Sequence, residues 1–183
     1  RVGEGLDKLR QSLSIFRDLV MRYPDQVTYR EQRVGLMGVL SRQLYEKGEV
    51  EAAIGVAKEA LELAEYGWKR WPKEKNSAKM MFSATFNLRY EYTVLGRYDD
   101  AIAISKRAVA MSRQSYEYAP EDLRRANRLA GAINNLAGDY ERSGMRREMV
   151  ETARECAAFI AKEMGQNGWV PSLRAGANSL RVD

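Results

Sequence analysis

The sequence contains no histidine and a single cysteine, Cys156. Without histidine, no mechanism can use an imidazole as a base, a proton shuttle or a metal ligand. One cysteine allows neither an intrachain disulfide framework nor a zinc site built from several thiolates. No apolar run approaches the ~20 residues of a membrane-spanning helix, and no charged stretch followed by an apolar one opens the sequence. We therefore expect a cytoplasmic protein that does not insert into membranes.

Proline and aromatic residues are also scarce. The 183 residues include four prolines, and the aromatic content is 9%, so the chain offers little of the composition that a strand-rich fold needs. Apolar residues make up 45% and charged residues 30%, which supplies a core and argues against disorder. A chain of this length suffices for one compact domain or one continuous array.

One period runs through the sequence. Proline recurs at positions 24, 72 and 120, and glycine recurs at 48, 96 and 144, so both markers keep a spacing of 48 residues. Apolar positions between the markers keep the same spacing, as shown by Leu40, Leu88 and Leu136. Different markers that share one spacing indicate an internal repeat.

Each period predicts two helices. From Val34 to Leu44 the apolar residues recur at steps of three and four, as on one face of a helix. Gly48 ends that helix because glycine adopts a left-handed backbone conformation without steric cost. Pro72 ends the second helix because it lacks an N–H and clashes with the preceding turn. We expect full repeats at 26–70, 74–117 and 121–164, a partial leading repeat at 4–22, and a short capping helix within the tail 169–183.

Small residues in the second helix predict how the helices pack. Alanine at positions 53, 57, 60 and 64 lets the two helices of a hairpin approach closely. Each hairpin then has an apolar face that only the next hairpin covers, so residues 1–183 are expected to form a single all-α array, an α-solenoid of antiparallel helix hairpins. The apolar stripe of the partial repeat lacks its natural cover, which predicts upstream sequence or self-association through this end. That stripe consists of Leu6, Leu9, Leu13 and Phe16.

Two segments carry a resemblance to a known family. Residues 48–54 (GEVEAAI) and 96–102 (GRYDDAI) are each followed six residues later by alanine, and they resemble the turn and second helix of tetratricopeptide repeats. Leu40 and Leu88 match the buried leucine of that family, and Tyr92 and Tyr140 match its aromatic residue. The usual period of the family is about 34 residues, so this chain resembles a long-period variant over residues 4–164.

The resemblance implies a right-handed superhelix in which the first helices of successive repeats line a concave groove. It also implies a non-catalytic scaffold that binds a partner peptide or domain in that groove, as part of a larger bacterial signalling or regulatory protein. Some relatives clamp a terminal carboxylate with lysine and asparagine one turn apart on the first helix. Gly38 and Arg42 do not reproduce that pair, so this specific activity is not carried over.

No pattern in the sequence predicts catalysis. The glycines never form a phosphate-cradling loop. Cys156 stands where earlier repeats have Ala60 and Ala108, so we expect a buried small residue rather than a reactive thiol. Paired acidic residues begin the second helices, where their negative charge interacts favourably with the positive end of the helix dipole. They are Glu49, Glu51, Asp99, Asp100, Glu148 and Glu151. We expect no catalytic residue, metal or cofactor, and the chain is not interpreted as an enzyme.

The inward-facing positions of the family give the candidate binding residues. They are Arg42, Tyr45, Phe86, Asn87, Tyr90, Asn134 and Asn135. Aromatic and arginine side chains often carry interface energy, and amides both donate to and accept from a peptide backbone. Glycines at 35, 38, 131 and 138 flank the aromatic residues. They provide either steric room for Phe86 and Tyr90 or the floor of a pocket for a ligand side chain.

A nucleic-acid-binding solenoid is the alternative from another functional class. The net charge is +5, but the two signs are interspersed, which is typical of an ordinary solvated surface. The basic clusters that would contact nucleic acid are Lys69, Lys73, Lys79, Arg124, Arg125 and Arg128. Binding of a protein or peptide partner is the favoured interpretation.

Overall fold

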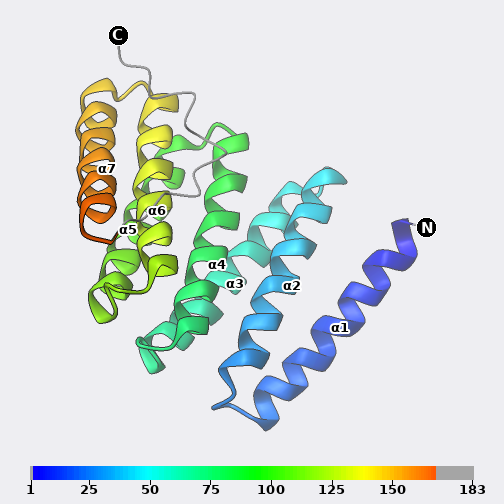
Figure 1. Ribbon diagram of the computed structural model, residues 1–183. Helices are drawn as coiled ribbons and strands as arrows, with labels where there is room; N and C mark the ends of the chain where they lie inside the picture. The colour runs from blue at the N-terminus through cyan, green and yellow to red at the C-terminus, as the bar shows by residue number, and fades with distance from the viewer. Residues whose placement is uncertain (1, 168–183) are drawn as a thin grey trace. The chain divides into compact units, whose positions relative to one another are not determined.

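The computed structural model of the chain describes the backbone of residues 2–167 and the side chains of residues 5–165. This part contains seven α-helices and no strand (Figure 1), so the all-α prediction is confirmed for the described residues. The helices are α1 (Val2–Arg22), α2 (Val27–Glu46), α3 (Val50–Arg70), α4 (Lys75–Val94), α5 (Tyr98–Tyr118), α6 (Leu123–Arg142) and α7 (Arg146–Asn167). The capping helix expected within 169–183 lies outside the described residues.

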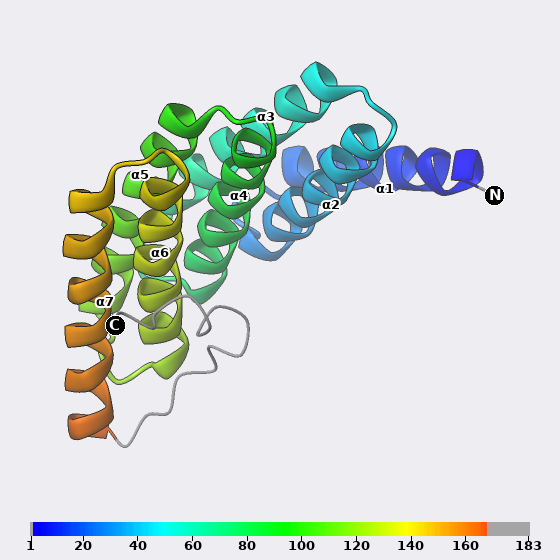
Figure 2. The same ribbon diagram turned by 90° about the horizontal axis from the view of Figure 1, so that it is seen from above.

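The helices belong to two compact units, residues 1–97 with α1 to α4 and residues 98–183 with α5 to α7. In the first unit, α2 and α3 form an antiparallel hairpin, α4 packs against both of them, and α1 packs against α2 (Figure 1). In the second unit, α6 packs against both α5 and α7 (Figure 2). The first unit therefore brings α2 and α4, the first helices of two successive repeats, into direct contact.

Glycine ends α2, α4 and α6 in the same way. Gly48, Gly96 and Gly144 have φ values of 82°, 69° and 79°, in the left-handed region that other residues enter only with strain. After α2, the Glu49 amide donates to the Leu44 carbonyl at 2.9 Å and the Gly48 amide donates to the Tyr45 carbonyl at 2.8 Å. The same pair of bonds recurs after α4 and α6. This is the Schellman arrangement, and the predicted role of the three glycines is confirmed.

The alanine-rich side of α3 lies in the core, as predicted. Ala53, Ala57, Ala60 and Ala64 are all buried. In the second unit, Cys156 is 2% exposed and packs with Leu129 and Ile133, which confirms the expected buried cysteine.

Ala108 differs from its counterpart Ala60, because it is only half-buried. The neighbouring Val109 instead packs against the apolar clusters around Leu136 and Ile133. Leu40 is also half-buried, whereas Leu88 and Leu136 are buried. The 48-residue spacing therefore predicts most, but not all, of the buried positions.

The apolar stripe of α1 is better covered than its sequence predicts. Leu6 is 3% exposed, and Leu9, Leu13 and Phe16 are half-buried. The cover comes from α2, against which α1 packs; the rings of Phe16 and Tyr29 have centroids 6.5 Å apart. The following helix therefore shields Leu6, while Leu9, Leu13 and Phe16 keep part of their surface exposed, and self-association through this end stays a prediction.

The buried alanine seam predicts a sharp contrast between two substitutions. Ala60→Leu adds three carbon atoms to a close helix contact and should lower the free energy of unfolding by roughly 1–3 kcal/mol. Ala108→Leu should cost less because that position is half-buried. Urea unfolding of the full chain measures both, with the exposed substitution Glu62→Gln as a control that stays within about 0.5 kcal/mol. Equal midpoints for Ala60→Leu and Glu62→Gln would contradict the packing.

Candidate functional site

A pocket of about 280 Å³ lies between α2 and α4 in the first unit. Its lining consists of Gly38, Arg42, Phe86, Asn87, Tyr90 and Glu91. We call it the α2–α4 pocket. Four of the seven binding residues predicted from the sequence meet here, one from α2 and three from α4.

The other three predicted residues lie elsewhere. Tyr45 is half-buried on α2 and does not line the pocket. Asn134 and Asn135 are half-buried on α6, in the second unit. The structure therefore brings together the arginine, one amide and the two aromatic residues that belong to the first unit.

The two aromatic side chains of the pocket are exposed. Phe86 and Tyr90 are 40% and 44% exposed, and they lie four residues apart, so they share one face of α4. Phe82 stacks on Phe86 with a centroid distance of 6.5 Å, and the Arg89 guanidinium carbon lies 5.5 Å from the Phe86 ring centroid. These neighbours hold Phe86 in place while part of its ring stays accessible to a ligand.

Gly38 explains how α4 approaches α2 so closely. A Cβ atom at this position would lie 2.1 Å from Asn87 Nδ2, far inside contact distance. The space beside Gly38 is thus occupied by the Asn87 amide and not by the aromatic residues, which corrects the idea of steric room for Phe86 and Tyr90 at this position. Gly38 is part of the pocket lining. At Gly35 no atom lies within 4 Å of the added Cβ, so crowding does not require glycine there.

Glu91 lines the pocket, although the sequence analysis did not single it out. Its side chain is 3% exposed, and its Oε1 atom accepts a hydrogen bond from Ser41 Oγ at 2.9 Å. Ser41 Oγ also lies 3.0 Å from the Ala53 carbonyl oxygen, and a hydroxyl has one proton to donate. Glu91 Oε2 is buried without a hydrogen-bond partner among the described residues. The ionised carboxylate is therefore poorly satisfied in the free chain.

The surroundings of Glu91 favour its neutral form. Burial raises the pKa of the Glu91 carboxyl above its ordinary value, because a charged group loses hydration in the interior. The hydrogen bond from Ser41 and the positive charge of Arg42 act in the opposite direction and are weaker. Arg42 itself is exposed.

A sequence signal for Glu91 existed in the 48-residue spacing. Residues 43, 91 and 139 correspond, and they are glutamine, glutamate and aspartate. The carboxylates at two of these three positions are informative, because each lies between apolar repeat positions and charged residues are rarely buried without a partner. Reading the polar positions of the period, as well as the apolar ones, would have found it.

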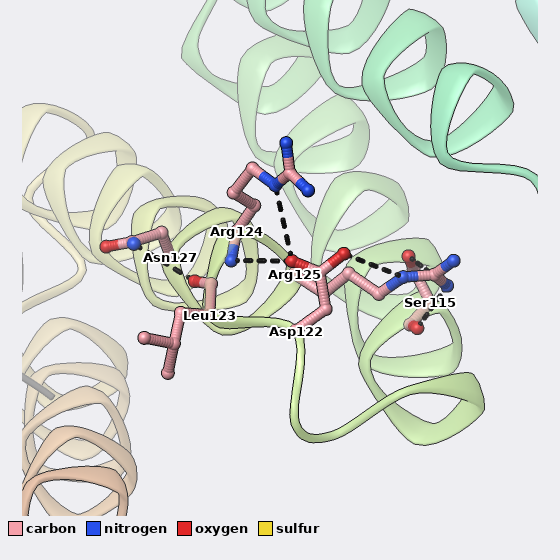
Figure 3. Close-up of polar contacts among 6 residues, drawn as sticks. All are labelled: Ser115, Asp122, Leu123, Arg124, Arg125 and Asn127. Atoms are coloured by element: carbon pink, nitrogen blue, oxygen red, sulfur yellow. Dashed lines mark hydrogen bonds and ion pairs between the residues drawn. The ribbon is translucent and has the colours of Figure 1, made fainter. Parts of the chain in front are cut away.

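The basic clusters predicted to contact nucleic acid include a buried residue, Arg125, which is 3% exposed. Its Nη1 atom donates to the Ser115 carbonyl oxygen at 2.7 Å, and its Nε atom lies 3.8 Å from Asp122 Oδ2 (Figure 3). Asp122 also accepts from the Arg124 amide at the start of α6. Arg125 thus stabilises the turn between α5 and α6. The alternative interpretation had expected this residue to contact nucleic acid, but its side chain is not available for that. Lys79 is paired too, with Glu31 at 2.5 Å.

A second cavity, of about 260 Å³, is lined by residues of α1, α2 and α3. Its arginines already have acidic neighbours: Arg33 Nη2 lies 2.8 Å from Glu59 Oε1, and Arg10 lies 4.0 Å from Asp7. This cavity lacks a buried polar group without a partner, so the α2–α4 pocket is the stronger candidate site.

Within residues 5–165, no cluster of three or more acidic or cysteine side chains is arranged to hold a metal ion. Among the helices of the described part, none combines the length and the apolar character needed to cross a membrane.

Comparison with known proteins adds little. No protein-family model matches the chain, and no curated protein matches it. Among solved structures, the chain is similar to BtubC (BKLC) from P. vanneervenii, with 15% sequence identity over 100% of this chain and 98% of that one. The TM-score of 0.32 is too low for this likeness to bear on fold or function.

The raised pKa of Glu91 predicts a pH-dependent stability. Below the ordinary carboxyl pKa, the neutral Glu91 makes its full contribution to the free energy of unfolding. This contribution is lost as the pH rises through the raised pKa, because ionisation costs more in the folded chain than in the unfolded chain. Glu91→Gln keeps an oxygen for Ser41 and cannot ionise. The variant should therefore gain stability relative to the wild type between pH 4 and pH 8, measured by urea midpoints. Parallel curves for the two proteins, as expected for exposed Glu62→Gln, would refute this role.

Proposed function

We propose that the chain is a non-catalytic protein-interaction module that binds an extended peptide segment of a partner protein. The observation that carries this proposal is the meeting of Arg42, Phe86, Asn87 and Tyr90 in the α2–α4 pocket. Large aromatic rings left half-exposed beside a pocket are typical interface anchors. A pocket of about 280 Å³ suits one or two side chains of a peptide rather than a large cofactor.

The polar groups of the pocket suit a peptide backbone. The Asn87 amide offers both a donor and an acceptor, and the Arg42 guanidinium offers several donors. Arg42 forms no hydrogen bond or ion pair among the described residues, and it is exposed. The aromatic rings would supply most of the binding energy, while Asn87 and Arg42 orient the backbone. The amides Asn134 and Asn135 remain candidate binding residues of the second unit.

The motif resemblance supports the wider interpretation. We propose that the hairpins belong to a right-handed α-solenoid of the tetratricopeptide kind, in a long-period form, and that the module serves a larger signalling or regulatory protein. The Schellman glycines and the buried alanine seam are the features on which this assignment rests. A nucleic-acid function is not proposed, because Arg125 is buried and Lys79 is paired with Glu31.

Removing the two aromatic anchors tests the proposal. Peptides selected on the full chain from a displayed random library serve as ligands, and their affinities are measured by fluorescence anisotropy. Phe86→Ala combined with Tyr90→Ala should weaken binding by at least about 2 kcal/mol, or roughly 30-fold, with unchanged helicity by circular dichroism.

The matched control removes exposed apolar side chains outside the pocket. Ile15 and Met21 are 53% and 67% exposed on α1, and replacing both by alanine should leave the affinity unchanged. If the control pair and the pocket pair weaken binding equally, or if neither does, the peptide does not bind in the α2–α4 pocket.

A further inference from the structure

The repeat position of Glu91 is polar in all three repeats, and its counterpart in the second unit is Asp139. Asp139 is fully buried on α6 and accepts a hydrogen bond from Ser105 Oγ on α5 at 2.5 Å. Glu91 likewise is buried and accepts a hydrogen bond from a serine of a neighbouring helix, Ser41 of α2. Each acid thus accepts a hydrogen bond from a serine of a neighbouring helix in its own unit, although the two serines do not occupy corresponding repeat positions.

The two acids differ in the charge beside them. Arg142, one helical turn after Asp139, places Nη1 3.8 Å from Asp139 Oδ1. The residue one turn after Glu91 is Val94, which is uncharged. Among the described residues, Glu91 has no ion-pair partner, and its Oε2 atom accepts no hydrogen bond. In the first unit the positive charge that acts on Glu91 is that of Arg42, which is exposed and forms no ion pair with the carboxylate.

A buried carboxylate without an ion-pair partner is energetically costly. A bound group that carries a positive charge is therefore strongly preferred there over a neutral group. Asp139 lies beside its own arginine, whereas Glu91 lies against the α2–α4 pocket. A positive charge in direct contact with Glu91 is therefore best supplied from that pocket, by a bound molecule.

We propose that the α2–α4 pocket selects a lysine or arginine side chain of the bound peptide, whose cationic group pairs with Glu91 beside the rings of Phe86 and Tyr90. This inference rests on the proposed function, because it names the side chain that the peptide presents to the pocket. The ligand cation takes the place that Arg142 holds beside Asp139.

The aromatic lining favours the same ligand. The face of an aromatic ring attracts a cation, and the Arg89 guanidinium already lies over the Phe86 ring. Arg42 and Arg89 are the opposing charges; Arg42 is exposed, so water and salt screen it. Glu91 is 3% exposed, so its attraction for a cation in the pocket is screened much less. Arg42 remains available to carbonyl oxygens of the peptide.

Neutral isosteres provide the first test. The probes are short Gly/Ser/Ala peptides capped at both ends, with one central arginine, citrulline, lysine or norleucine. Titrations of the full chain are followed by NMR shifts of the Phe86, Tyr90 and Glu91 amides. We expect the arginine and lysine peptides to bind at least about tenfold more tightly than citrulline and norleucine. Glu91→Gln should abolish that difference, and Glu62→Gln should preserve it.

Val94→Arg provides a second test, because it places an arginine where the second unit has Arg142. Val94 is 40% exposed, so the longer side chain has room. The new arginine should pair with Glu91 and weaken the arginine peptide about tenfold, with little change for the citrulline peptide. Val94→Gln, which adds bulk without charge, is the matched control and should leave the preference intact.

The outcomes separate the two proposals. Equal binding of arginine and citrulline peptides at the pocket would overturn the selection of a cation and leave peptide binding standing. Absence of any shift with the arginine and lysine peptides would overturn the selection as well. Failure of the library to yield any pocket-dependent peptide would instead overturn the proposed function. As a further probe, a citrulline peptide with a free N-terminus is titrated. If this peptide binds and the capped arginine and lysine peptides do not, the pocket pairs with a terminal amine, and the selection of a side-chain cation is overturned.

Discussion

A glycine with positive φ at the end of α2, α4 and α6 determines how each of these helices is followed by the next. The backbone reverses within a few residues there, and two hydrogen bonds to the carbonyls of the last turn close the reversal. An L-residue would adopt this conformation only with strain. In the first unit the resulting hairpin packs α3 against α2, and α4 then contacts both helices. Gly38 of α2 meets Asn87 of α4 at this contact. The pocket depends on that geometry.

Glu91 illustrates a tension between stability and binding. A buried carboxyl group with one bound oxygen and one orphaned oxygen lowers the stability of the free chain when it ionises. Glutamine would fit the same place and keep the bond to Ser41 without that cost. A residue that is unfavourable for folding and lies against a pocket is easier to understand as part of a recognition site than as part of the core.

The helices and the alanine seam were predictable because they depend on local signals. Periodicity, glycine and proline act within one or two turns of the chain, so the positions of Gly48 and Ala60 follow from the sequence around them. The contact between Gly38 and Asn87 is different, since it depends on the distance between two helices and joins residues that lie 49 positions apart in the sequence. Burial of Arg125 was missed for a similar reason: one of its partners, the Ser115 carbonyl, is a backbone group that no side-chain pattern reveals.

The close contact between Gly38 and Asn87 also limits how α4 can slide along α2. Moving one helix by a single residue shifts it by about 1.5 Å and turns it by about 100°, which would bring the side chain of Met37 or Val39 toward the Asn87 amide. A notch that accepts one amide therefore works as a positional lock between the two helices. Insertions or deletions within α2 or α4 would break this lock, whereas changes of length in the loops before Val27 and Lys75 would leave it intact.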